Sequence, residues 1–351
     1  MAISILKQLR TEPTPIINNN TATFVWKGRI PPLLVGDFTG WDDGNPVKLE
    51  KHEPRVWTYQ LTLPQDAYIE YGFLKGEESL MDPFNPRQTP NGVGGTNNYF
   101  TMPGYKPSEL ALKNRRIPHG TVTQHSISTE YLLTGNYRRV HLYQPPCTER
   151  APLVVVWDGL EYLHRIRLNQ IVDNLISQER IRPIAIAFVS NGGQKSRTGE
   201  YACNEATLAF LMTEVLPLAT KELNLLDIDT LPGEFGVIGA SMGGLMALYT
   251  GTRIPQVFGK VLSQSGAFSM AGIDMVVFDL LEHTEIRPLR IWMDVGIYDL
   301  PGLLVSNQRM QILLNQRGYP ITYREYNAGH NYPSWRDDIW RGLEALYGFE
   351  I

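Results

Sequence analysis

Cysteine is scarce in this chain of 351 residues, which has only Cys147 and Cys203. So few thiols exclude a disulfide framework and a cysteine-rich zinc site, and we expect both to be small buried side chains. An excess of one charge is also missing, since 32 Lys and Arg residues face 36 Asp and Glu residues, a formal net charge of −4. This small negative net charge argues against nonspecific electrostatic binding to DNA, RNA or anionic lipid.

Long hydrophobic runs are absent as well. No segment approaches the roughly 18 uninterrupted apolar residues that a membrane-spanning helix needs. The first ten residues, MAISILKQLR, have neither an unbroken apolar stretch nor a small-residue cleavage site, so we expect no secretion signal. We therefore expect a soluble, cytoplasmic protein with no nucleic-acid and no membrane partner, and the sequence leaves its oligomeric state open.

The length exceeds the roughly 250–300 residues at which a single core stops growing, so two domains are expected. Residues 1–105 have short extended runs separated by turn residues, and the run 57–63, WTYQLTL, alternates as a strand with one buried face does. We predict a small β-sandwich there. A segment rich in Pro and Gly, 106–120, is the expected linker.

Residues 121–351 follow a different pattern, in which strands and amphipathic helices alternate. The runs 153–157 and 184–189 are entirely apolar, as parallel strands covered by helices on both faces are. The alternation predicts an α/β layer fold with right-handed crossovers.

The front domain carries several characteristic segments: 34–41 (LVGDFTGW), Val56-Trp57, 69–73 (IEYGF) and Asp82-Pro83-x-Asn85. With them it resembles the immunoglobulin-like module of glycan-branching enzymes and enterochelin esterases. In glycan-binding members of that group an exposed Trp stacks on sugar. For Trp41 and Trp57 we favour core packing, because aromatic side chains are mostly buried.

The most informative segment is 239–243, Gly-Ala-Ser-Met-Gly, between a predicted strand at 234–238 and a helical stretch at 245–249. This is the context of a nucleophile elbow, where a serine on a strained strand-to-helix turn projects its hydroxyl out of the sheet. We predict Ser241 as a nucleophile. The alternative is a helix-capping serine with incidental glycines.

A serine hydroxyl needs a base to take its proton. Of the seven histidines only His330 lies on the loop that follows the last predicted strand, 321–326, and Gly329 before it would let the chain bend. For the other six we prefer structural or surface roles.

An acid should orient the imidazole, and the chain order of α/β-hydrolases is Ser, acid, His. Asp294 and Asp299 both fit. Asp299 is favoured because it lies on a loop after the strand 289–295, whereas Asp294 can point into the sheet. Capping of the helix that starts near Leu303 is the alternative role of Asp299.

Two donors should bind the oxyanion of a tetrahedral intermediate. One is the amide of Met242, which follows the serine. The second should come from the loop after the strand 153–157, and the amides of Gly159 and Leu160 stay open as candidates.

With these residues almost all of the chain resembles the esterase D/enterochelin esterase family. The matching residues are Trp157-Asp158-Gly159, Arg197, Glu200-Tyr201, Asn204, Glu214–Pro217, Gly239–Gly244, Gly296, Asp299, Gly329-His330 and Trp335-Arg336. The resemblance implies an α/β-hydrolase fold, ester cleavage without metal or organic cofactor, and Asp299 as the acid. This sequence departs from the family pattern at Asn331, where many relatives carry an acidic residue directly after the histidine.

Two-domain members of the family hydrolyse the trilactone of ferric catecholate siderophores, which makes such an ester the expected small-molecule substrate. Arg197 would then face anionic catecholate oxygens, or form an ion pair with Glu200, itself a candidate substrate-binding residue. Trp335 would line the pocket or pack beneath the histidine loop. The alternatives are an acetyl or feruloyl esterase acting on acylated carbohydrate, and a non-catalytic binding protein on a hydrolase fold.

Overall fold

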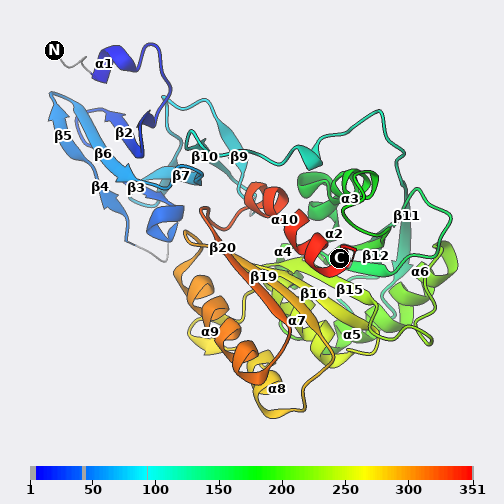
Figure 1. Cartoon of the computed structure of the whole chain (residues 1–351). Helices are drawn as coiled ribbons and strands as arrows, with labels where there is room; N and C mark the ends of the chain where they lie inside the picture. The colour runs from blue at the N-terminus through cyan, green and yellow to red at the C-terminus, as the bar shows by residue number, and fades with distance from the viewer. Residues whose placement is uncertain (1–4, 42–44, 93, 350–351) are drawn as a thin grey trace. The chain divides into compact units, whose positions relative to one another are not determined.

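The computed structural model describes residues 5–41, 45–92 and 94–349, which form two compact units (Figure 1). The first comprises the chain up to Pro107 together with Gly296–Pro301 and Glu325–Ser334. The second comprises Ser108–Val295, Gly302–Arg324 and the residues from Trp335 onward.

The first unit contains two antiparallel sheets. One has the strand order β1-β2-β6-β5, and the other has the order β4-β3-β7-β10-β9 with β8 paired to β7. The strands are β1 Ile16–Asn18, β2 Thr21–Lys27, β3 Leu33–Gly36, β4 Val47–Lys48, β5 Glu50–Glu53, β6 Val56–Thr62, β7 Tyr68–Lys75, β8 Glu78–Leu80, β9 Gln88–Pro90 and β10 Thr96–Thr101. The short helical segments are α1 Ile5–Gln8 and the 3₁₀ turn η1 Asp37–Thr39.

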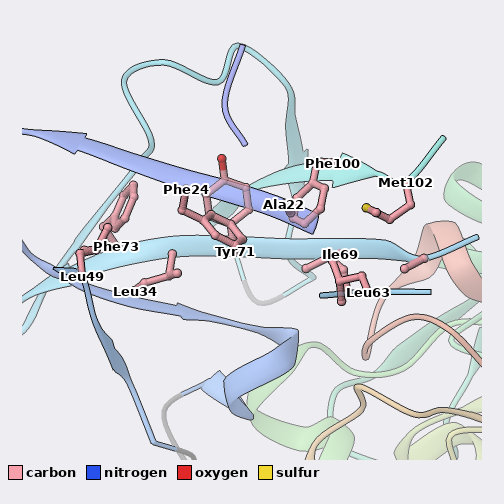
Figure 2. Packing of buried hydrophobic residues seen from close by; sticks show 11 residues of the cluster. Ala22, Phe24, Leu34, Leu49, Leu63, Ile69, Tyr71, Phe73, Phe100 and Met102 are labelled. Atoms are coloured by element: carbon pink, nitrogen blue, oxygen red, sulfur yellow. The ribbon is translucent and has the colours of Figure 1, made fainter. Parts of the chain in front are cut away.

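Both sheets contribute to one hydrophobic core, which makes the first unit a sandwich. Phe24 of β2 meets Tyr71 of β7 and Phe100 of β10 edge to face, with ring centroids 4.9 Å and 5.6 Å apart (Figure 2). The buried face predicted for the alternating run 57–63 is also present, since Trp57 and Tyr59 of β6 pack against this core. The β-sandwich predicted from the alternating sequence is therefore confirmed.

The second unit is built on a long sheet with the order β11-β12-β14-β13-β15-β16-β19-β20. Neighbouring strands from β14 to β19 are parallel, and β11 and β12 add an antiparallel edge. The strands are β11 Thr121–Ser128, β12 Tyr137–Gln144, β13 Leu153–Trp157, β14 Ala185–Val189, β15 Phe235–Ala240, β16 Phe258–Gln264, β19 Arg290–Gly296 and β20 Ile321–Tyr326, with a separate hairpin of β17 Ser269–Met270 and β18 Ile273–Asp274. All residues of β13 and β14 are buried, as their apolar runs predicted.

Helices cover both faces of this sheet. A Cβ at Gly251 would lie 2.4 Å from Val261, and one at Gly342 would lie 2.6 Å from Leu262. Because consecutive strand residues point to opposite faces, the helices that carry these glycines, α7 and α10, lie on opposite sides. The helical segments are η3 Glu109–Ala111, α2 Gly159–Glu161, η4 Tyr162–Ile166, α3 Leu168–Ser177, α4 Gln194–Tyr201, α5 Glu205–Phe210, η5 Leu211–Val215, α6 Leu216–Glu222, α7 Met242–Arg253, α8 Val277–His283, α9 Pro301–Arg317 and α10 Tyr332–Tyr347.

The two compact units are not separated by a single boundary at the predicted linker, 106–120. Two segments that the sequence analysis assigned to the hydrolase part, 296–301 and 325–334, belong to the compact unit of the sandwich. Backbone contacts hold the second of these segments against the sandwich, since Tyr68 of β7 forms a parallel bridge with Ala328 and donates its N–H to the carbonyl of Asn327 at 3.1 Å.

Among the described helices, none combines the length and apolar character that crossing a bilayer requires.

Candidate active site

Ser241 occupies a strained turn at the end of a central strand. It follows β15 directly and precedes α7, with φ 58° and ψ −124°, a conformation that non-glycine residues rarely adopt. A Cβ at Gly239 would lie 2.2 Å from the carbonyl oxygen of Gly243, so the turn closes only with glycine there. Ser241 is partly exposed. The local geometry is that of the predicted nucleophile elbow.

Backbone hydrogen bonds hold this turn to the neighbouring strand. The N–H of Ser241 donates to the carbonyl of Gln264 at 2.9 Å, and the carbonyl of Ser241 accepts from the N–H of Ala267 at 3.0 Å. Met242 is the first residue of α7 and is buried, so its N–H belongs to the helix turn that has no intrahelical acceptor. That position suits the predicted oxyanion donor.

The loop predicted to supply the second oxyanion donor follows β13, at the point where the strand order of the sheet reverses. β13 pairs with β14 on one side and with β15 on the other, and ligands of open α/β sheets bind at the carboxyl ends of such strands. Gly159 and Leu160 both lie in α2 at this end. A Cβ at Gly159 would lie 2.3 Å from the backbone of Phe188, so close packing on β14 requires this glycine.

His330 forms a hydrogen-bonded pair with Asp299. Its Nδ1 lies 2.9 Å from Oδ1 of Asp299, and the carboxylate side chain is fully buried while the imidazole is 22% exposed. Since a carboxylate only accepts, Nδ1 carries the proton, which makes Nε2 the basic nitrogen. Asp299 is thus the candidate acid that contacts the histidine.

Asp294 has a different environment. Its Oδ2 accepts from Nε1 of Trp292 at 2.8 Å and from Nε2 of Gln264 at 3.4 Å, within the core of the second unit. Burial, reinforced by the nearby charge of Asp338, raises the pKa of Asp294 well above its usual value. This carboxyl points into the sheet, as the strand argument anticipated.

A second histidine–aspartate pair, His119 with Asp173, has both ring nitrogens of the imidazole bonded to protein groups. Nδ1 of His119 lies 2.9 Å from Oδ2 of Asp173, but its Nε2 lies 2.8 Å from the carbonyl of Asn114. With both ring nitrogens engaged, this imidazole has a structural role of the kind predicted for the other histidines.

Asp158 organises the polar groups beside the elbow. It directly follows β13 in a left-handed conformation with φ 55°, and it is almost fully buried. Nε and Nη2 of Arg197 donate to its two oxygens at 2.8 Å and 2.5 Å, and Nδ2 of Asn191 donates to Oδ1 at 2.6 Å. Nη2 of Arg197 also reaches the carbonyl of Ala240 at 3.4 Å, one residue before the serine. Sequence reasoning missed this pairing, although Asp158 stood in the matched Trp-Asp-Gly motif.

Glu200 has a partner other than the one the sequence analysis considered. Its Oε1 accepts from Nη2 of Arg138 at 2.8 Å, and Oε2 accepts from the N–H of Gly192 at 3.1 Å. Both members of this ion pair are buried. The ion pair between Arg197 and Glu200 that the sequence analysis considered is therefore replaced by two others. Arg138 of β12 pairs with Glu200, and Asp158, which follows β13, pairs with Arg197.

The remaining aromatic and polar candidates are structural in their contacts. Trp335 is buried, and its Nε1 donates to the hydroxyl of Ser265 at 3.0 Å, as the packing alternative required. Oδ1 of Asn331 accepts from the N–H and the hydroxyl of Ser334 at 3.0 Å and 2.6 Å, which caps α10. Nε1 of Trp41 and of Trp57 donate to Asp37 and to the carbonyl of Gly28.

Within the part of the chain that the structure describes, no group of three or more His, Cys, Asp or Glu side chains is arranged to hold a metal ion. Burial raises the pKa of Tyr201 well above its usual value, and the adjacent charge of Asp158 raises it further, so this phenol stays protonated. Its oxygen accepts the N–H of Asp158 at 3.1 Å.

The model of the Esterase family, described as "Putative esterase", matches residues 133–346, well over half of the chain. The chain belongs to this family. It is therefore a carboxylic ester hydrolase by family, which agrees with the resemblance of its motifs.

Similar proteins point the same way. The iron(III) enterobactin esterase of Dickeya dadantii is 29% identical over 60% of this chain, and the match spans about half, 52%, of that relative's length. The iron(III) salmochelin esterase of Escherichia coli is 26% identical over 93% of this chain and 87% of its own. The enterobactin esterase of Shigella flexneri, solved in the presence of enterobactin, has a TM-score of 0.77 with 22% identity over 99% of both chains. That structural likeness confirms the predicted fold.

Proposed function

We propose that this chain is a serine esterase in which Ser241, His330 and Asp299 act as a catalytic triad. The observation that carries the proposal is the strained Ser241 between β15 and α7, in a chain of the Esterase family. The His330–Asp299 hydrogen bond supports it, because it leaves Nε2 of the imidazole as the base.

In the proposed reaction, Oγ of Ser241 attacks the ester carbonyl carbon while its proton passes to Nε2 of His330. The resulting oxyanion is bound by the N–H of Met242 and by a second N–H from Gly159 or Leu160. Collapse of this intermediate breaks the ester C–O bond, and the leaving alkoxide takes the proton from the imidazolium. Water, losing a proton to the same Nε2, then attacks the acyl carbon, and the second tetrahedral intermediate breaks its bond to Oγ, which takes the proton back from the imidazolium. This releases the acid and restores Ser241.

The proposed substrate is the trilactone of a ferric catecholate siderophore, with the iron as cargo that ester cleavage would help to release. The names of the relatives in Dickeya dadantii and Escherichia coli support this class. Contact of Arg197 with catecholate oxygens stays a prediction, and the bidentate bond to Asp158 already occupies part of this guanidinium. A cytoplasmic location also stays a prediction, which cell fractionation would test.

Labelling with a fluorophosphonate followed by peptide mass spectrometry tests the nucleophile. We expect one adduct, on the peptide containing Ser241, and its loss in the Ser241→Ala variant together with hydrolysis of p-nitrophenyl acetate. Ser269→Ala is the matched control, since Ser269 is also partly exposed but lies in the hairpin strand β17. Undiminished turnover by Ser241→Ala would contradict the assignment.

A substrate panel tests the class of ester. Ferric catecholate trilactone, acetylated xylan fragments and feruloylated sugars are compared at equal concentration by kcat/KM. We expect the trilactone to be the best substrate. Rapid turnover of a sugar ester with no reaction on the trilactone would replace the siderophore proposal with a carbohydrate esterase.

A further inference from the structure

A buried carboxyl of the sandwich lies against the loop that carries His330. Asp37 begins the turn η1 after β3 and is only 3% exposed. Its Oδ1 accepts from Nε1 of Trp41 at 2.8 Å, and its Oδ2 accepts from the N–H of Glu70 at 2.8 Å. Both oxygens are therefore fixed by the sandwich itself.

Gly329, directly before His330, is packed on this carboxyl. A Cβ at Gly329 would lie 2.1 Å from Cγ of Asp37 and 2.3 Å and 2.5 Å from its two oxygens. These are the three nearest atoms, and Gly329 is not among the residues with positive φ. Glycine is required here by the close approach of Asp37, and not by the backbone bend that the sequence suggested.

Further contacts attach the same loop to the sandwich. The carbonyl of Asn327 accepts from the N–H of Tyr68, and Nδ2 of Asn327 donates to Oδ1 of Asp66 at 2.6 Å. The loop of Asp299 is joined to it, because the N–H of Tyr298 donates to the carbonyl of Ala328 at 3.1 Å. The ring of Tyr298 packs against the sandwich core. Both members of the His330–Asp299 pair thus lie on loops that the sandwich supports.

Burial and the neighbouring carboxylates both affect the pKa of Asp37. Burial raises the pKa of Asp37 well above its usual value, and the charges of Glu70 and Asp299 raise it further, although the hydrogen bonds from the Glu70 N–H and from Trp41 oppose this. The titratable groups that face it are Glu70 and Tyr68 from β7, and Asp299 from the loop after β19. The raised pKa favours the neutral form of Asp37 more than in an ordinary aspartate, which lessens the negative charge beside Asp299.

We propose that Asp37 is a positioning residue of the esterase site, whose carboxyl supports Gly329 and thereby holds His330 in its hydrogen bond with Asp299. The effect on catalysis rests on the proposed function, but the effect on the His330–Asp299 hydrogen bond does not. The sandwich is on this view a structural part of the catalytic machinery.

A double-mutant cycle tests the contact. Gly329→Ala introduces a methyl group against Asp37, and a misplaced imidazole should lower kcat by on the order of 10²-fold with little change in KM. Asp37→Ala removes all three clashing atoms and leaves the loop unsupported, so kcat should fall as well. The Asp37→Ala/Gly329→Ala protein places the new methyl in the vacated space and should recover most of kcat, a coupling that independent sites do not show.

Asp82→Ala is the matched control. Asp82 is another buried sandwich aspartate, 2% exposed, whose oxygens accept from Thr14, Tyr71 and Phe84. Its loss should lower the stability of the sandwich and leave kcat unchanged in protein that circular dichroism shows to be folded. If Asp37→Ala behaves like Asp82→Ala, or if the double variant is no better than Gly329→Ala, the proposal is wrong.

A proton NMR signal gives a readout that does not depend on ester cleavage. The Nδ1–H of His330, bonded to Asp299, should give a far-downfield resonance, which His330→Gln identifies by its loss. We expect Gly329→Ala and Asp37→Ala to lose or shift it, and the double variant and Asp82→Ala to keep it. An unchanged resonance in both single variants would overturn the positioning role. Failure of the proposed function would appear instead as persistent activity of Ser241→Ala, with the NMR result intact.

Discussion

The imidazole of His330 and the carboxylate of Asp299 are joined through Nδ1 and Oδ1 at 2.9 Å, and the same oxygen accepts the N–H of Leu300 at 2.7 Å. The second contact fixes the carboxylate on its own loop. The pair therefore has a defined orientation within the compact unit of the sandwich, and it selects one tautomer of the histidine.

Asp299→Asn should lower kcat for p-nitrophenyl acetate by about 10³–10⁴-fold, because an amide at this place favours the wrong tautomer of His330. KM should change little, and steady-state kinetics measures both. Asp294→Asn is the control, since that carboxyl bonds Trp292 and Gln264 instead. A larger loss of kcat in Asp294→Asn than in Asp299→Asn would reverse the assignment of the acid.

The raised pKa of Asp294 makes stability depend on pH. The folded state binds its proton more tightly than the unfolded state, whose carboxyl titrates near about 3.9, so the free energy of unfolding falls as pH rises above that value. Asp294→Asn lacks this titration. The stability of the wild type relative to Asp294→Asn should therefore decline by up to about 1.4 kcal/mol per pH unit between about pH 4 and the folded pKa. Urea unfolding of both proteins across this range measures it, and a constant difference would show that Asp294 titrates normally.

Glu200→Ala should destabilise the second unit without changing substrate affinity. It leaves the buried guanidinium of Arg138 without its carboxylate, a loss that typically costs about 3–5 kcal/mol. Denaturant unfolding should show this loss, and KM for the trilactone should stay at the wild-type value in folded protein. An unchanged stability with a raised KM would instead support the substrate-binding role predicted from the sequence.

Arg197→Met should lower kcat on neutral and on catecholate esters alike. Removing the guanidinium leaves the buried Asp158 without its cationic partner, and Asp158 directly precedes the candidate oxyanion donors Gly159 and Leu160. Loss of one oxyanion donor typically costs about 10²–10³ in kcat, which sets the upper limit of the effect. Comparison of p-nitrophenyl acetate with the trilactone is the measurement. A rise in KM confined to the trilactone would assign Arg197 to catecholate recognition.

Much of this site could be predicted because its chemistry is local. A serine flanked by glycines between an apolar strand and a helix specifies its own strained turn, and the structure has that turn at Ser241. The loop position of Asp299 and the strand position of Asp294 were likewise enough to favour the correct partner of His330.

Pairings between distant segments could not be predicted in the same way. The sequence suggested an ion pair of Arg197 with Glu200 across one turn or loop. The fold instead brings Asp158 to Arg197 from 39 residues away and Arg138 to Glu200 from 62 residues away. Which charged groups come within contact distance of a long side chain depends on the order of the strands in the sheet. No pattern among neighbouring residues encodes that order.

By itself the sequence determined an α/β domain behind a β-sandwich, the serine on its elbow, and the histidine loop, because strand periodicity and turn chemistry are properties of neighbouring residues. Only the tertiary structure decided that the loops of Asp299 and His330 belong to the compact unit of the sandwich. The physical reasons are the backbone contacts of Tyr68 with Asn327 and Ala328 and the close approach of Gly329 to Asp37. These contacts join segments that are far apart in the sequence, and the last of them is possible only because Gly329 has no side chain.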